Sequence, residues 1–393
     1  MVQRKMYMEK LIKAKDKNII KVITGVRRCG KSTLLMLYQE YLKQCGISEE
    51  RIVSVNFEDV ANEVLLDYRK LHQYIAARLD DKDITYVFLD EVQNVAEFQK
   101  AVDSLFLRAK IDIYITGSNA YMLSGELATL LSGRYIEIQM LPLSFSEYYE
   151  LVGGDRREAW AAYYKNGGFP YAASIEDKEI RSDYISGIYS TVLLKDIVSR
   201  KRISDVTMLE SIIKFLADNI GNIVSSKKIA DSLTSYGRKT SSVTVENYIR
   251  ALSDAFILYR ADRYDVKGKQ YLKSLEKYYI VDLGFRTLLL GDSNTDVGHI
   301  LENIVYLELI RRGYKVYIGK IEDKEIDFVA EKNGDKEYYQ VAATVLDPNT
   351  FAREIAPLKM INDNYPKYIL SMDEMPMGED GIKQVNVLEF LLT

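Results

Sequence analysis

The sequence predicts an α/β fold whose N-terminal part is built on a parallel β-sheet. Across the first 140 residues, short apolar runs rich in β-branched residues alternate with longer amphipathic segments. The apolar runs are residues 19–24, 52–57, 84–89, 111–116 and 135–139, and the amphipathic segments are residues 31–45, 63–79 and 96–109. The first kind is typical of buried strands and the second of helices. Strands that alternate with helices form parallel sheets covered on both faces, so we expect that architecture here.

Composition places the chain among ordinary globular proteins. Its 393 residues exceed one typical core, so we expect several domains. Hydrophobic residues make up 47% and charged residues 28%, which excludes a mostly disordered chain. No apolar run is long enough to span a bilayer, and residues 1–17 are too charged for a secretory signal, so we expect a cytoplasmic protein without a membrane partner. The few cysteines and histidines argue against a disulfide framework and against histidine-based zinc chemistry.

A phosphate-binding loop is predicted directly after the first strand. Residues 25–32, Gly-Val-Arg-Arg-Cys-Gly-Lys-Ser, match the pattern G-x-x-x-x-G-K-[ST]. In this pattern the backbone N–H groups surround phosphates, the Lys31 ammonium reaches the β- and γ-phosphates, and the Ser32 hydroxyl holds Mg²⁺. We therefore expect ATP and Mg²⁺ as cofactors. The residues expected to contact them here are Gly25, Val26, Arg27, Arg28, Cys29, Gly30, Lys31, Ser32 and Thr33.

Two carboxylates are expected to complete this site. The apolar run 86–89 ends in Asp90 and Glu91. Asp90 at a strand end can bind Mg²⁺ through water, and Glu91 can orient and polarise the attacking water. Asn56 and Glu58, after the second strand, are candidates for coupling ligand binding to Glu91.

Two further residues have open interpretations. Asn119 follows the next strand, where it either contacts the γ-phosphate or the attacking water, or caps a helix from residue 120 onward. Arg134 precedes the last strand of the sheet and either acts on a neighbouring subunit's nucleotide or forms a surface salt bridge. The expected catalytic residues are Glu91, Lys31, Asn119 and Arg134.

Five motifs together resemble a large bacterial and archaeal group of AAA+ ATPases. They are GVRRCGKS at residues 25–32, FLDEVQ at 88–93, ITGSNA at 115–120, LSGR at 131–134 and LPLSFSEY at 141–148. The resemblance spans nearly the whole chain. It implies Walker A roles for Lys31 and Ser32, Walker B roles for Asp90 and Glu91, a sensor role for Asn119 and a finger role for Arg134. It also implies assembly into a ring or partial ring, and a C-terminal domain similar to the PD-(D/E)xK nucleases.

The middle of the chain is basic although the whole chain is acidic. Residues 199–280 contain 15 Lys and Arg against 9 Asp and Glu, whereas the remaining residues contain 38 against 48. This asymmetry points to a local anionic partner, with a solvated basic face as the alternative. Two amphipathic helices are expected at residues 226–233 and 242–253, followed by hairpin-like runs at 256–260 and 267–277. Helix, turn, helix and basic hairpin is the plan of a winged-helix domain.

DNA is therefore the expected partner of this segment, through backbone contacts without sequence specificity. The alternative is a module that packs within the protein or binds another protein. The residues expected to contact phosphates are Arg238, Lys239, Lys267 and Lys269.

Acidic residues of the C-terminal region follow the PD-(D/E)xK order. Glu302 lies in a helical stripe, Asp327 in a strand-like run, and Gln340 in a second such run. In enzymes with this layout the acids hold Mg²⁺ and a lysine stabilises charge or positions water. Here the last motif reads Gln340-Val341-Ala342 and lacks the lysine. We therefore expect a binding platform more than a cleaving enzyme.

Four domains follow from these patterns: a P-loop AAA+ core at residues 1–142, a small helical lid at 143–202, a winged-helix domain at 203–285, and an α/β restriction-endonuclease-like domain at 286–393. The leading hypothesis is an ATPase whose nucleotide cycle alters its grip on DNA, branched DNA included. The alternatives are a nucleotide-operated signalling switch that binds a protein partner, and an ATP-dependent nuclease.

Overall fold

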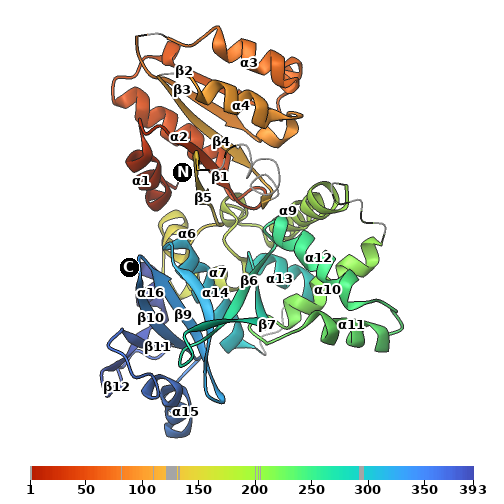
Figure 1. Cartoon of the computed structure of the whole chain (residues 1–393). Coiled ribbons are helices and arrows are strands. Elements are labelled where there is room, and N and C mark those ends of the chain that lie inside the picture. Colours follow the sequence, from red (N-terminus) through yellow and green to blue (C-terminus); the bar gives the residue numbers. More distant parts are fainter. Residues whose placement is uncertain are drawn as a thin grey trace. The chain divides into compact units, whose positions relative to one another are not determined.

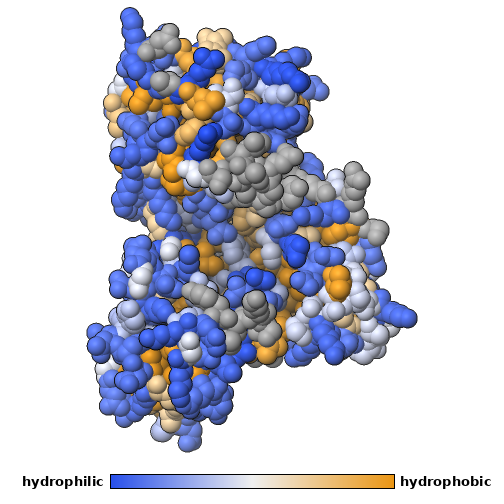
Figure 2. Space-filling view, viewed as in Figure 1, coloured by the Kyte–Doolittle hydropathy of each residue, from blue (hydrophilic) through white to orange (hydrophobic). Residues whose placement is uncertain are grey.

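A computed structural model of the chain describes residues 2–80, 82–108, 110–120, 131, 133–199, 201, 203, 205–291 and 296–393. The chain forms two compact units. The first contains the residues up to Met140 together with Asp254–Phe256, and the second contains Leu141–Ser253 and Ile257–Thr393. No helix in the described ranges is both long and apolar enough to cross a membrane. On the face drawn in Figure 2, most side chains are hydrophilic and the hydrophobic ones lie in small groups.

The first unit contains a five-stranded parallel sheet, which confirms the predicted architecture (Figure 1). The strand order is β2-β3-β4-β1-β5. The strands are β1 (Ile20–Thr24), β2 (Ile52–Asn56), β3 (Thr85–Asp90), β4 (Ile111–Gly117) and β5 (Tyr135–Gln139). The helices are α1 (Lys5–Ala14), α2 (Lys31–Gln44), α3 (Tyr68–Ala76) and α4 (Phe98–Phe106), with short 3₁₀ segments η1 (Glu49–Arg51), η2 (Val60–Leu66) and η3 (Val92–Asn94).

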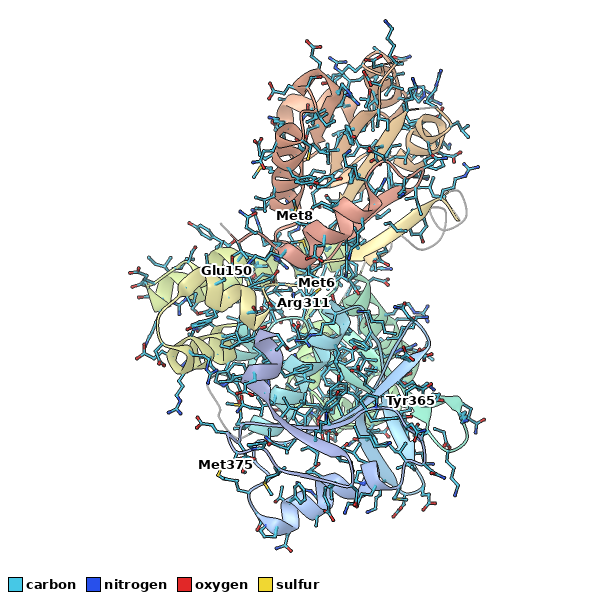
Figure 3. All side chains as sticks on the ribbon, turned by 90° about the vertical axis from the view of Figure 1, so that its left-hand side faces the viewer. Met6, Met8, Glu150, Arg311, Tyr365 and Met375 are labelled. Atoms are coloured by element: carbon cyan, nitrogen blue, oxygen red, sulfur yellow. The ribbon has the colours of Figure 1, made fainter. Side chains whose placement is uncertain are left out.

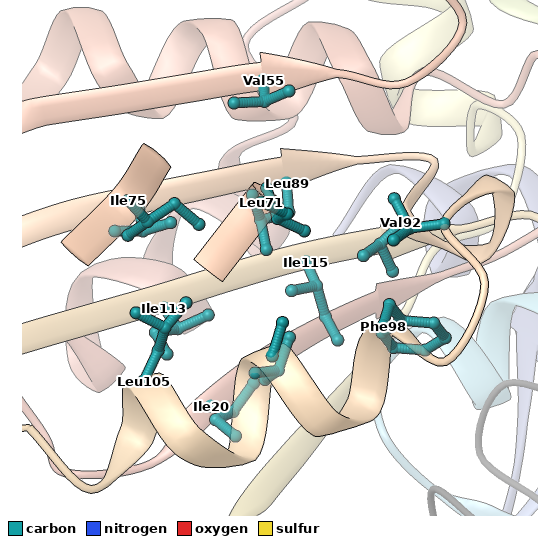
Figure 4. Close-up of a cluster of buried hydrophobic side chains, with 14 of the residues drawn as sticks. Ile20, Val55, Leu71, Ile75, Leu89, Val92, Phe98, Leu105, Ile113 and Ile115 are labelled. Carbon is teal, nitrogen blue, oxygen red and sulfur yellow. The ribbon is translucent and has the colours of Figure 1, made fainter. Parts of the chain in front are cut away.

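Both faces of this sheet are covered, which is why its central strands are mainly apolar. Two buried charges, Lys21 on β1 and Asp112 on β4, form an ion pair with each other. Successive side chains of a strand point to opposite faces. On β3, Leu89 packs into a buried cluster with Leu71 of α3 and residues of α4 (Figure 4). Its neighbour Phe88 instead lies with its ring 6.2 Å from the ring of Tyr38 on α2. Helices α3 and α4 therefore cover one face, and α2 covers the other.

The amphipathic segment at residues 63–79 was expected to be one helix, and this expectation is wrong. The Asp67 carboxylate accepts hydrogen bonds from the backbone N–H groups of Arg69 and Lys70, so α3 begins directly after it. The preceding residues form the 3₁₀ segment η2. An aspartate favours this capping position over a helix interior because its side chain competes for backbone N–H groups.

The second unit contains an eight-stranded mixed sheet in the order β12-β13-β11-β10-β9-β8-β6-β7. Its strands are β6 (Leu258–Asp265), β7 (Gln270–Ile280), β8 (Lys315–Ile321), β9 (Lys324–Lys332), β10 (Asp335–Val341), β11 (Lys367–Ser371), β12 (Gly378–Glu379) and β13 (Ile382–Asn386). Its helices are α6 (Phe145–Val152), α7 (Arg156–Asn166), α8 (Pro170–Ala173), α9 (Lys178–Thr191), the π-helical η5 (Val192–Ser199), α10 (Val206–Asp218), α11 (Ser226–Ser235), α12 (Ser242–Asp254), α13 (Leu283–Leu290), α14 (Val297–Arg311), α15 (Pro348–Lys359) and α16 (Val387–Leu392).

One sheet joins segments that lie far apart in the sequence. Strand β6 pairs in parallel with β8, with Arg263 opposite Ile318, so the β6–β7 hairpin extends the C-terminal strands. Helix α14 packs against β7, β8, β9 and β10, and 11 of its 15 residues are buried. The expected division at residue 285 thus falls inside α13, between the β6–β7 hairpin and α14, which both belong to this sheet layer.

Arg311, labelled in Figure 3, fixes the end of α14. Its Nη1 donates to the carbonyl oxygen of Pro142 at 2.8 Å, and its Nε donates to Glu308 at 3.1 Å. A buried arginine that donates hydrogen bonds to both a carboxylate and a carbonyl oxygen has its charge compensated. The contact therefore ties α14 to the segment that precedes α6.

Candidate functional site

The loop between β1 and α2 has the backbone that its glycines permit. Gly25 has φ 149° and Gly30 has φ 104°, and Arg28 between them also has a positive φ of 67°. A Cβ atom at Gly25 would lie 2.1 Å from the carbonyl oxygen of Met140, so no other residue fits there. The loop ends at Lys31, where α2 begins and presents its free N–H groups.

Lys31 is folded over this loop and almost fully buried. Its Nζ donates to the carbonyl oxygens of Gly25 at 3.1 Å and Val26 at 3.3 Å. The same atom lies 3.5 Å from Oε1 of Glu91. The sequence-predicted lysine and carboxylate therefore meet, although 60 positions separate them in the chain.

Strand order explains this meeting. Strand β4 lies between β1 and β3, so the carboxyl ends of the three strands share one edge of the sheet. Asp90 ends β3, and its carboxylate accepts hydrogen bonds from the hydroxyls of Thr116 on β4 and Ser32 on α2. Asn56 at the end of β2 also donates to Asp90 at 3.2 Å. Burial raises the pKa of Asp90, and the two hydroxyls partly oppose that rise.

Glu91 is held in an uncommon conformation. Its φ of 54° lies in the left-handed region, and its N–H donates to Thr116 Oγ1 at 2.9 Å. The Gln93 amide donates to its carboxylate, which also interacts with the Ser118 hydroxyl. Burial alone would raise the pKa of Glu91, but the Lys31 ammonium and these donors outweigh burial and lower it. The carboxylate is therefore kept ionised in a buried place.

Other predicted residues lie around this edge. Asn119 is buried, and the helix expected from residue 120 onward lies outside the described residues. Cys29 is fully buried with its Sγ 3.5 Å from the carbonyl oxygen of Met140. Arg27 forms an ion pair with Glu58. Arg134, by contrast, precedes β5 and lies at the amino edge of the sheet, where its carbonyl oxygen accepts a hydrogen bond from the N–H of Ile20. Its side chain forms an ion pair with Asp103 in its own chain, which is the salt bridge weighed against a finger role.

The four residues expected to contact DNA are all exposed, but two of them have protein partners. Arg238 donates to the carbonyl oxygen of Thr207 at 2.8 Å and to Ser211 Oγ at 2.6 Å, so it holds the turn after α11 against α10. Lys267 pairs with Glu322 at 3.1 Å. Lys239 and Lys269 lie exposed, before α12 and between β6 and β7.

The three residues of the nuclease-like motif do converge in the second unit. Asp327 lies on β9 beside a bulge, its N–H donates to Gln340 Oε1 at 2.7 Å, and its carboxylate accepts from the N–H of Val341 at 2.8 Å. Gln340 in turn donates to Glu354 at 2.9 Å. Bulges of this kind redirect a side chain.

A lysine that the sequence analysis missed lies among these carboxylates. Lys277 on β7 places its Nζ 2.9 Å from Glu302, 2.7 Å from Glu325 and 4.0 Å from Asp327. Burial opposes its charge, but the three carboxylates outweigh burial and raise its pKa. In the described part of the chain, no three His, Cys, Asp or Glu side chains are arranged as a metal site. Lys277 was missed because the motif places its lysine on the strand of Gln340, whereas Lys277 enters from the hairpin.

Comparisons with known proteins identify an AAA domain that covers most of the first unit. A model of the AAA domain family matches residues 17–149, and a model of a domain of unknown function matches residues 157–296. An uncharacterized protein of Haemophilus influenzae is 42% identical over 100% of this chain and 99% of its own length. One of Methanocaldococcus jannaschii is 30% identical over 91% of this chain and 83% of its own length. The solved structure of the Walker-type ATPase of Pyrococcus abyssi has a similar fold, with a TM-score of 0.50 at 16% sequence identity. The match covers 74% of this chain and 96% of the Pyrococcus chain.

Proposed function

Because the chain belongs to the same family as these Haemophilus and Methanocaldococcus relatives and contains an AAA domain, we propose that it binds and hydrolyses ATP at the edge formed by β1, β3 and β4. The observation that carries this proposal is the meeting of Lys31, Asp90 and Glu91 beside the glycine loop. A lysine, a metal-binding carboxylate and a water-polarising carboxylate are the groups that phosphoryl transfer to water needs.

Phosphates would bind where the loop and α2 present N–H groups. The positive end of α2 and the loop backbone favour an anion there. Lys31 has its ammonium against two carbonyl oxygens and Glu91, and the β- and γ-phosphates would replace these acceptors. The hydroxyl of Ser32 and the carboxylate of Asp90 already contact each other, and they fit as the residues that hold Mg²⁺. When bound, Mg²⁺ neutralises phosphate charge.

Glu91 would then be free to act on water. Its lowered pKa keeps it an acceptor at neutral pH, and Gln93 and Ser118 fix its carboxylate. The carboxylate would accept a hydrogen bond from the attacking water and orient it toward the γ-phosphorus. Asn119 would assist from the end of β4, and Arg134 would act on the nucleotide of a neighbouring subunit in a ring or partial ring.

A binding measurement tests the phosphate contacts. Titration of a fluorescent ATP analogue with Mg²⁺ should give an affinity that Lys31→Ala lowers by about tenfold or more, the contribution of a charge-assisted hydrogen bond. Lys43→Ala is the matched control, since Lys43 lies on the same helix but pairs with surface Glu40 and Glu49. Equal affinity of Lys31→Ala and Lys43→Ala would overturn the proposed site.

We further propose that the second unit contacts DNA backbone through α11, α12 and the β6–β7 hairpin. The elements of this region follow the order of a winged-helix domain: α10, the bridge of Val224 to Glu276, α11, α12 and the β6–β7 hairpin. Lys239 and Lys269 are two of the exposed lysines that the sequence predicted in this region, and they support phosphate contacts. The nucleotide cycle would then alter the grip of the protein on DNA.

Salt dependence tests the DNA proposal. Duplex and branched DNA should bind more weakly as salt rises, and Lys239→Glu and Lys269→Glu should each reduce the salt slope by about one. Lys13→Glu, on an exposed position of α1, controls for the change in net charge. A protein partner captured without nucleic acid, together with salt-independent DNA titrations, would favour the signalling switch instead.

For the carboxylate cluster of the second unit, we propose a structural role without cleavage. Lys277 neutralises part of the charge of Glu302, Glu325 and Asp327 from within the protein. Gln340 is occupied by the Asp327 N–H and by Glu354. Metal-dependent nicking of plasmid DNA by the wild type, lost in Asp327→Ala, would instead establish the ATP-dependent nuclease.

A further inference from the structure

A cavity of about 490 Å³ lies within the second unit, between α7, α13 and α14. Its walls include Trp160, Tyr164 and Lys165 from α7, Arg286 from α13, and Ile300 and Leu301 from α14. None of these residues belongs to the nucleotide site, to the four residues expected to contact DNA, or to the carboxylate cluster around Lys277. Pockets of 300 to 1,000 Å³ are the usual size for small organic ligands.

Arg286 is a buried cation at this cavity without a carboxylate partner among the described residues. Only 6% of the residue is exposed, and its Nε donates to the carbonyl oxygen of Ala217 at 3.2 Å. No carboxylate of the described residues forms an ion pair with it. By contrast, Lys277 and Arg311, which are equally buried, each lie within 3.1 Å of a glutamate oxygen. A buried charge is ordinarily paired, so the guanidinium is suited to an anion that the described residues do not supply.

Tyr164 presents a second hydrogen-bond donor at this cavity. Its Oη is buried, and no residue in the described ranges accepts or donates a hydrogen bond there. Arg286 acts on Tyr164 electrostatically, so the two groups share one environment. Asp296 also acts on Tyr164, but its carboxylate is paired with His299 Nδ1 at 2.6 Å. Buried hydroxyls normally have partners, and here the cavity is the place where one can bind.

The remaining walls suit a ring. Trp160 and Tyr164 offer aromatic surfaces, and Leu301 and Ile300 offer aliphatic ones. The helices that carry the donors are held together, because Thr287 Oγ1 on α13 donates to the carbonyl oxygen of Lys165 on α7 at 2.7 Å. The cavity is therefore preformed, with polar donors on one part and apolar surface on another, as in small-molecule sites.

We propose that this cavity binds a small organic anion in which a carboxylate or phosphate is joined to a ring. The anionic oxygens accept hydrogen bonds from the Arg286 guanidinium and the Tyr164 hydroxyl, and the ring packs against Trp160 and the aliphatic wall. Arginine suits this role because its planar fork matches carboxylate and phosphate oxygens. The proposal is independent of ATP hydrolysis and concerns a second ligand.

The chain carries its own reporter for this site, because Trp160 is its one tryptophan. Phenyl phosphate, benzoate and neutral phenol are titrated while Trp160 fluorescence is recorded, with free N-acetyltryptophanamide correcting for absorption by the probe. We expect saturable changes with the two anions and a much weaker response to phenol. The stronger of the two anions identifies the ligand class as phosphate or carboxylate.

Variants separate this site from others. Arg286→Met should weaken anion binding about tenfold or more, and Tyr164→Phe should weaken it several-fold, as loss of a charge-assisted and a neutral hydrogen bond would. Arg157→Gln is the matched control on α7, since Arg157 is exposed and pairs with Glu374.

Tyr164→Phe keeps the result decisive if Arg286→Met does not fold, because it leaves the bond to Ala217 in place. Titrations without saturation would overturn the proposal. Anion affinities that are equal in wild type and Tyr164→Phe would overturn it as well.

Discussion

The Nζ of Lys31 lies 3.5 Å from Oε1 of Glu91, and both side chains are almost completely buried. The lysine of the phosphate loop thus pairs with the carboxylate proposed to activate water. Because the Lys31 ammonium would turn to the phosphates when nucleotide binds, its ion pair with Glu91 would weaken. Nucleotide binding would thus release the Glu91 carboxylate for catalysis.

Removing Lys31 should therefore destabilise the first unit. Lys31→Met leaves a buried carboxylate without its cation, which should lower the free energy of unfolding by about 3 to 5 kcal/mol. Urea unfolding without nucleotide measures this loss. Lys31→Met combined with Glu91→Gln should recover much of it, and an equal loss in both variants would show that the pair is not coupled.

Lys277 should be essential to the stability of the second unit. Lys277→Met leaves Glu302, Glu325 and Asp327 without the cation that lies between them, and about 3 to 5 kcal/mol should be lost. Part of the loss should disappear in acid, where the carboxylates become protonated. Lys267→Met is the control, because its exposed pair with Glu322 should contribute less than about 1 kcal/mol.

The contrast between Lys277 and Lys31 shows where sequence reasoning succeeds. The loop motif is local, and strands β1, β3 and β4 are apolar runs, so Lys31, Asp90 and Glu91 could be predicted together. The position of Lys277 among the carboxylates depends on the pairing of β6 with β8, in which Arg263 lies opposite Ile318. No local sequence pattern encodes a pairing between segments so far apart. The break of the predicted helix at Asp67 was missed for another reason, since its periodicity continues across the cap.

Asp282 should make the stability of the second unit depend on pH. It accepts hydrogen bonds from the N–H groups of Gly168 and Gly284, yet burial raises its pKa to about 7. Between the ordinary aspartate pKa near 4 and pH 7, the folded chain holds a proton that the unfolded chain has released. Stability should therefore fall as pH rises through this range, by up to about 1.4 kcal/mol per pH unit.

Asp282→Asn isolates this contribution, because asparagine keeps an acceptor and does not titrate. Relative to wild type, the variant should gain stability between pH 5 and pH 7 in urea unfolding. A difference between the two proteins that stays constant over this range would contradict the assignment.

Arg134 should act on a neighbouring subunit. In the structure it pairs with Asp103 of its own chain, so the two roles predict different results. As an arginine finger, Arg134→Ala should lower turnover roughly a thousandfold with little change in ATP affinity. Mixing Arg134→Ala with Lys31→Ala should then restore some turnover, because each variant supplies what the other lacks.

A surface role would give another pattern. Asp103→Asn would then reduce turnover as much as Arg134→Ala does, and mixing would restore nothing. That outcome would leave Arg134 as half of a structural ion pair.

ATP turnover by Glu91→Gln tests the central claim most directly. Glu97→Gln is its matched control, since Glu97 also has a left-handed φ of 54° but lies exposed and pairs with Lys100. Glu91→Gln should bind ATP with Mg²⁺ as tightly as wild type and lose nearly all hydrolysis, whereas Glu97→Gln should keep it. Hydrolysis at the wild-type rate by Glu91→Gln would contradict the proposed ATPase site.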